Sequence, residues 1–231
     1  MLRGPTGTGS PQACVSLLSG LLLAAAPVDV VWAAGQGGFV RRLEALALLQ
    51  TLRADLLGHD SSTAVLQAWC EAHGPPGLKI VAEHDPKAER APSAAAGEAL
   101  GLKPGQAVRY RRVKLACGKT VLSEADNWYL PASLTSEMNH TLDSSDAPFG
   151  AVVRPLAFRR RFLSAELLWK PLPDGWEKGA GTCSPKACAS PLSIPAHVLQ
   201  DTAVLTTPDG KPFSFVAETY TAAALEMALP R

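Results

Sequence analysis

Apolar residues recur at helical spacing in two neighbouring segments near the start of the chain. Residues 41–57 carry leucines at steps of three and four, a pattern typical of an amphipathic helix. These leucines are Leu46, Leu49, Leu52 and Leu56. Residues 59–62 (His-Asp-Ser-Ser) then offer caps for a second helix, which ends where Gly74 and two prolines follow. The pattern predicts two antiparallel helices joined by a short turn.

Beyond residue 77 the pattern changes to the short, alternating runs of strands. The predicted strands are 78–83, 108–117, 121–130, one or two within 151–169, 202–206 and 212–220. A helical turn is expected near 94–100 and a helix over 133–142, whereas 171–196 reads as a long loop. Tight turns at 118–120 and 207–211 favour hairpins. We therefore predict an α+β fold with an antiparallel sheet flanked by helices.

The first forty residues differ from the rest of the chain. Arg3 is the only charged residue before Asp29, and an apolar run follows it from about Val15. This resembles a secretory signal peptide, and the small residues of Val31-Trp32-Ala33-Ala34 offer a cleavage site. We predict a signal peptide or a disordered extension over 1–36, followed by a single domain over 37–231. The protein is then periplasmic or secreted, with a cytoplasmic location as the alternative.

Composition excludes several classes of protein. The 231 residues carry 22 basic and 21 acidic side chains, a net charge of +1, which argues against a nucleic-acid binder that depends on neutralising phosphates. Pro27 and Asp29 interrupt the apolar run, so we expect no stable membrane span. No phosphate-binding loop, dinucleotide fingerprint, serine-nucleophile elbow or zinc-protease motif is present. We accordingly expect no cofactor and no metal.

The number and placement of the cysteines indicate the cellular compartment in which the protein folds. Without Cys14, which lies in the predicted signal, four cysteines remain, an even number that fits disulfides in an oxidising environment. Cys183 and Cys188 flank a four-residue loop that a disulfide would close. Cys70 and Cys117 fall within a predicted helix and a predicted strand, where buried free thiols are common.

Two charged residues occupy strand positions where apolar residues are expected. Arg111 shares a strand face with Val113 and Leu115, so it points into the domain if that face is buried. A buried guanidinium needs an anionic partner from the protein or from a ligand. The alternative is that this end of the strand is near solvent and that both Arg109 and Arg111 point outward.

Glu218 lies in a run whose two faces are both partly apolar, which predicts a central strand and an enclosed carboxylate. Such a carboxylate either pairs with an arginine or has a raised pKa and donates a proton. In the run Arg159-Arg160-Arg161, alternation places at least one arginine inward. An inward arginine with an enclosed carboxylate indicates binding of a small organic anion, with acid catalysis as a further option.

Four short motifs, in this order along the chain, resemble the chorismate lyase family. They are the strand Tyr110–Gly118 with its Arg-x-Val-x-Leu pattern, Trp128-Tyr129-Leu130-Pro131, the turn Asp146–Gly150, and Phe215-Val216-Ala217-Glu218-Thr219-Tyr220. The resemblance extends from about Leu43 to Tyr220. The effector-binding domains of GntR-type regulators share this fold, but the chain shows no winged-helix DNA-binding part.

The resemblance implies an enclosed pocket for a hydroxybenzoate-like anion and the elimination of pyruvate from chorismate without metal or cofactor. By motif position, Arg111 would hold a carboxylate and Glu218 would act as the acid. The chain has Asn127 where the family has an arginine four residues before the proline. Arg154 and Arg160 are then the candidates for the second carboxylate contact.

Three functional hypotheses follow. The first is a chorismate lyase-like enzyme that releases 4-hydroxybenzoate and pyruvate, which would make an enolpyruvyl carboxylate its partner. The second is a non-catalytic, exported binding protein for a small aromatic carboxylate. The third is an exported, disulfide-stabilised protein in which Arg111 and Glu218 serve structure alone.

Overall fold

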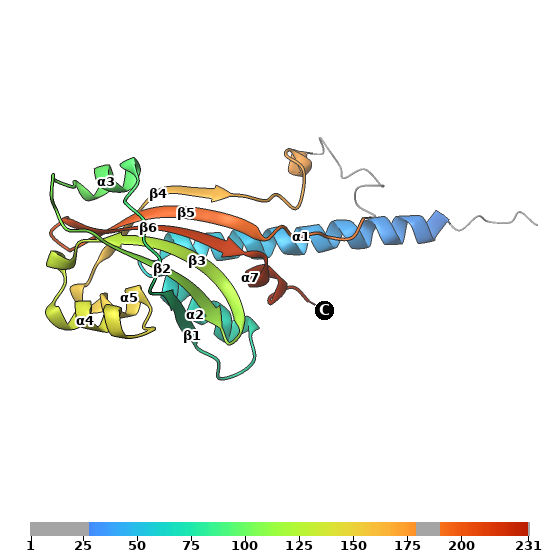
Figure 1. Ribbon diagram of the computed structural model, residues 1–231. Coiled ribbons are helices and arrows are strands. Elements are labelled where there is room, and N and C mark those ends of the chain that lie inside the picture. Colours follow the sequence, from blue (N-terminus) through green and yellow to red (C-terminus); the bar gives the residue numbers. More distant parts are fainter. Residues whose placement is uncertain (1–27, 179–189, 231) are drawn as a thin grey trace, which may run out of the picture.

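Two helices form the start of the described structure. The computed structural model describes residues 28–178 and 190–230. Helix α1 (Val28–Gly58) and helix α2 (Ser62–His73) confirm the predicted pair. Ser61 caps α2, because its hydroxyl accepts a hydrogen bond from the Ala64 N–H. Helix α1 begins well before Arg41, so its N-terminal part runs beyond the sheet (Figure 1).

One six-stranded antiparallel sheet forms the centre of the molecule. Its strands are β1 (Ile80–Asp85), β2 (Arg109–Cys117), β3 (Thr120–Tyr129), β4 (Arg159–Leu167), β5 (His197–Thr206) and β6 (Pro212–Thr221). Their spatial order is β1-β2-β3-β6-β5-β4. Each half of the chain thus contributes a three-stranded meander, and the two meanders join where β3 pairs with β6. The predicted α+β class with an antiparallel sheet is confirmed.

Short helices fill the connections between strands. They are α3 (Ala94–Leu100), η1 (Pro131–Ser133), α4 (Ser136–Ser144), α5 (Phe149–Val152), η2 (Arg154–Leu156), η3 (Trp176–Lys178) and α7 (Ala222–Glu226). Region 151–169 holds one strand, because 149–156 form helical turns around Pro155. Strand β5 starts at His197, before the predicted Thr202.

The two faces of the sheet are covered unequally. Helices α1, α2, α4 and α5 lie on one side, and α3 lies on the other (Figure 1). We call the first side the inner face; β2 turns Arg111, Val113 and Leu115 towards it, confirming the predicted alternation. On the outer face, Trp128 and Phe215 pack with Ala96 and Leu100 of α3.

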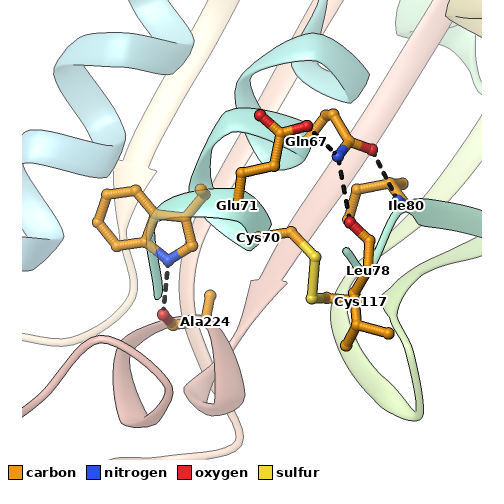
Figure 2. The surroundings of a disulfide bond; sticks show 8 residues. Gln67, Cys70, Glu71, Leu78, Ile80, Cys117 and Ala224 are labelled. Carbon is orange, nitrogen blue, oxygen red and sulfur yellow. Dashed lines mark hydrogen bonds between the residues drawn. A yellow bond between two sulfur atoms is a disulfide. The ribbon is translucent and has the colours of Figure 1, made fainter. Parts of the chain in front are cut away.

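The largest apolar cluster lies between α1, α2, α7 and the inner face, and includes Leu49, Leu66 and Tyr220. A disulfide within it joins Cys70 of α2 to Cys117 of β2 (Figure 2). The expectation that these two cysteines are free thiols is therefore wrong. The apolar stripe of the helix lies directly on the inward-facing end of the strand, and that packing brings the two Cα atoms to 5.7 Å.

The same end of α2 is held by two polar side chains. The Gln67 amide accepts a hydrogen bond from the Ile80 N–H at 2.8 Å and donates to the Leu78 carbonyl at 3.5 Å (Figure 2). The Trp69 indole donates to the Ala224 carbonyl of α7 at 2.8 Å. Helix α2 is thus fixed to strand β1, strand β2 and helix α7.

Neither a membrane-crossing helix nor a metal-binding cluster of His, Cys, Asp and Glu occurs in residues 28–178 and 190–230. The proposed disulfide pair Cys183 and Cys188 lies outside these residues, as does most of the predicted signal segment.

Candidate functional site

The join between the two meanders creates the candidate site. Across the inner face, Arg111 of β2 is opposite Asn127 of β3, and Asn127 is opposite Val216 of β6. In the next row Glu218 of β6 lies between Ala125 of β3 and Asp201 of β5. Side chains that are distant in sequence therefore share one small area of the sheet.

A cavity of about 40 Å³ lies between this area and the helices, and we call it the inner cavity. Its polar lining includes Arg111, Asn127, Arg160 and Glu218, so four of the five predicted site residues meet there. The N-terminal residues of α2, Ser61 to Thr63, and the start of α5 at Phe149 and Gly150 close it from the helical side. The exposed Arg154 of η2 is not among the residues that line it.

Arg111 is buried and has no carboxylate partner among the described residues. The residue is 2% exposed, and its Nη2 donates to the Ser145 carbonyl at 3.2 Å. Its Nε and Nη1 are buried and have no hydrogen-bond partner in the described part of the chain. Burial lowers the pKa of Arg111, as expected of a cation without close compensation. The outward alternative is wrong for Arg111 but holds for Arg109, which is exposed and pairs with Asp143.

Glu218 belongs to a buried cluster of charges. Its Oε1 accepts a hydrogen bond from the Ser62 hydroxyl at 2.7 Å, and its Oε2 accepts from Arg160 Nη2. The same Nη2 donates to Asp201 Oδ1 at 2.8 Å. The Tyr220 hydroxyl lies 3.2 Å from Asp201 and 3.3 Å from Glu218. The predicted Arg–Glu pair exists, and its arginine is Arg160.

Two carboxylates share one guanidinium in this cluster, which changes its titration. Burial, and then the charge of Glu218, raise the pKa of Asp201 to about 7. Burial also raises the pKa of Tyr220 well above its usual value. Burial lowers the pKa of Arg160, but the two carboxylates outweigh it and the net shift is upward. The raised pKa of Asp201 therefore lets the cluster hold a proton near neutral pH.

The remaining predicted residue, Asn127, is buried and accepts a hydrogen bond from the Ser214 hydroxyl at 2.6 Å. Sequence reasoning did not single out Asp201, Ser62 or Tyr220. Asp201 shares the inward face of β5 with Leu199, Ala203 and Leu205. Had the strand been predicted from His197, the same alternation that found Arg111 would have found Asp201.

A second depression, larger and more open than the inner cavity, also borders Arg111, and we call it the outer groove. Its volume is about 620 Å³, and it lies between the end of β1, the loop after it, the start of β2 and helix α4. Its lining includes His84, Ala91, Val108, Tyr129 and Leu142 as well as Arg111. The Arg111 side chain thus borders both spaces.

No family model matches the chain. A relative from Sinorhizobium fredii, the uncharacterized protein y4mC, is 48% identical over 191 residues, which cover 82% of this chain and 80% of that protein. The chain belongs to the y4mC family.

Two solved structures have some likeness to this y4mC-family chain. PhnF from Mycobacterium smegmatis matches with a TM-score of 0.47 and 15% identity over 72% of this chain. The match spans 65% of the PhnF chain, less than two thirds of its length. The ligand-binding domain of a putative GntR-family transcriptional regulator from Bordetella bronchiseptica matches with a TM-score of 0.36 and 19% identity, over 64% of this chain and 92% of that one.

Proposed function

We propose that the protein binds a small organic carboxylate through Arg111. The observation that carries this proposal is a guanidinium that is 2% exposed, borders a cavity and leaves two nitrogens without a partner in the described structure. A buried, uncompensated charge is costly, so an anion that receives hydrogen bonds from Nε and Nη1 gains binding energy there. The planar guanidinium fork matches a carboxylate.

Helix α2 supports the choice of an anion. Its first residues line the inner cavity opposite the sheet, and the N-terminus of a helix carries a partial positive charge. Gly150 of α5 closes against this end of the helix, since a Cβ at that position would lie at contact distance, 3.4 Å, from the hydroxyls of Ser61 and Thr63. Arg111 and the α2 N-terminus thus favour negative charge from two sides.

Binding is tested by titrating the protein with benzoate and 4-hydroxybenzoate, using calorimetry and the shift in melting temperature. Arg111→Gln should weaken binding roughly tenfold or more, because a charge-assisted hydrogen bond is lost. Arg112→Gln is the matched control; this residue is next along the strand, is partly exposed and pairs with Glu124. Equal affinity in Arg111→Gln and in the control would refute the proposal.

Chorismate lyase activity is the second candidate, and one observation favours it. Glu218, the acid that the motif resemblance implies, lines the same inner cavity as Arg111. However, the Glu218 carboxylate already accepts hydrogen bonds from Ser62, Arg160 and Tyr220. Asp201, whose pKa is raised, is a residue of this cluster that can hold a proton near neutral pH.

Pyruvate release from chorismate by the purified protein decides between the two candidates. If the protein is a lyase, Glu218→Gln should abolish turnover and keep 4-hydroxybenzoate binding. Pyruvate at the background level, together with Arg111-dependent binding of 4-hydroxybenzoate, would reject the lyase and leave the binding protein.

A further inference from the structure

The inner cavity and the outer groove differ greatly in the size of group that each admits. A water molecule needs about 10–15 Å³, so the inner cavity of about 40 Å³ admits roughly three such groups. That is enough for the three heavy atoms of a carboxylate, but too little for a benzene ring. The outer groove, at about 620 Å³, falls in the range of about 300–1,000 Å³ that is typical of ligand pockets. Arg111 lies where the two spaces meet.

The charges around these two spaces leave a single cation for a ligand. Among the described residues that line them, four are arginines: Arg90, Arg109, Arg111 and Arg160. Arg90 pairs with Asp126, Arg109 with Asp143, and Arg160 with both Asp201 and Glu218. Of these four arginines, Arg111 alone has no carboxylate within ion-pair distance in the described structure. The site therefore compensates one negative charge, and a second would find no free cation among these four arginines.

The outer groove is lined by both polar and apolar groups and suits an uncharged body. Ala91 and Val108 supply apolar surface, and the half-buried Tyr110 supplies an aromatic ring. The other arginines of the groove are paired with carboxylates, as described above. The His84 imidazole adds a hydrogen-bonding group; burial and the nearby Arg111 cation lower its pKa, so the ring is neutral at neutral pH.

From this juxtaposition, and resting on the proposed function, we infer the class of ligand: a monocarboxylate whose uncharged body is at least as large as one ring. Its carboxylate binds Arg111 where the two spaces meet, and its body lies in the outer groove rather than in the inner cavity. A dicarboxylate of the same skeleton, the charge class to which chorismate belongs, is disfavoured because no second free cation meets it.

Three probes test separately the contributions of the carboxylate, of the uncharged body and of a second charge to binding. They are acetate, 3-phenylpropanoate and 3-(4-carboxyphenyl)propanoate, each titrated by calorimetry or, for acetate, by NMR. We expect 3-phenylpropanoate to bind several-fold more tightly than the dicarboxylate, because the second carboxylate loses part of its hydration in the groove and meets no free cation. Acetate should bind weakly and depend on Arg111 alone.

Substitutions that fill the outer groove test where the body lies. Ala91 is exposed and Ala88 is half-buried, both on the groove wall, so Ala91→Trp and Ala88→Trp reduce the space with little risk to folding. Each should weaken 3-phenylpropanoate binding roughly tenfold and leave acetate binding unchanged, since the lost contact is with the ring. Ala95→Trp, at an exposed position of α3 away from both spaces, is the control.

The outcomes distinguish this inference from the proposed function. If Arg111→Gln abolishes 3-phenylpropanoate binding and neither groove variant weakens it, the body lies elsewhere; the inference fails and the function stands. The same holds if the dicarboxylate binds as tightly as the monocarboxylate, or if benzoate binds and 3-phenylpropanoate does not. If Arg111→Gln binds all probes like the native protein, or none binds the native protein at millimolar concentration, the proposed function itself fails.

Discussion

At the scale of single residues, the most unusual group is Asp201. It is 1% exposed and shares the Arg160 guanidinium with Glu218, so two negative charges compete for one positive charge. Because its pKa is about 7 in the folded protein and about 3.8 when unfolded, the folded state holds a proton that the unfolded state has lost between those values. The contribution of Asp201 to the free energy of unfolding therefore falls as the pH rises from about 4 to about 7, and is constant above that.

Asp201→Asn should remove this dependence, because asparagine is neutral throughout. The melting temperature of the variant minus that of the native protein should rise between about pH 4 and pH 7 and then level off. Asp209→Asn is the control: this exposed carboxylate has its pKa lowered by its hydrogen bond to Lys211, so its difference should be flat in that range. A flat difference for Asp201→Asn as well would contradict the assigned proton.

Strand alternation offered an inward position for Arg111 and required at least one inward arginine in Arg159-Arg160-Arg161, and the two partly apolar faces around Glu218 predicted its enclosure. The same alternation did not reach Asp201, because the predicted strand began one residue later, at Thr202. Which carboxylate Arg160 would meet depends on the pairing of β4 with β5 and of β5 with β6, and this register is a tertiary property. Arg154 was a candidate for the second carboxylate contact, but the turn around Pro155 leaves it exposed.

At the scale of elements, helix α2 connects the disulfide to the site. Its N-terminal end places Ser62 on Glu218, and Cys70, two turns later, is bonded to Cys117 of β2, the strand that carries Arg111. The disulfide therefore holds the two walls of the inner cavity together. Alternation and helical spacing had placed both cysteines on apolar faces, but which helix lies on which strand is decided only by packing.

Replacing both Cys70 and Cys117 by alanine should destabilise the domain by about 4 kcal/mol in the chain-entropy model, because the bond closes a loop across 47 residues. Urea unfolding with and without a dithiol reductant measures the loss. The reductant should lower the midpoint of the native protein and leave the midpoint of the double variant unchanged. A double variant as stable as the oxidised native protein would show that the bond contributes little.

At the scale of the whole molecule, the disulfide also bears on location. We propose that the protein is exported, since structural disulfides persist mainly in oxidising compartments. N-terminal sequencing of the native protein should then find a start near residues 33–37, after the small residues that follow Trp32. Helix α1 runs through this region, so cleavage would shorten it and leave intact the part from residue 38 that packs on the sheet. A start at Met1 would reject cleavage.

The joining of the two meanders along β3 and β6 also has a kinetic consequence. Within each meander, neighbouring strands are paired through connections that are local in sequence, whereas Asn127 and Val216 are roughly ninety residues apart, a separation that makes their pairing slow. Arg111 and Asn127 belong to the first meander, and Arg160, Asp201 and Glu218 belong to the second. The inner cavity, which needs residues of both meanders, should therefore form only in the last phase of refolding, after the hairpins have formed.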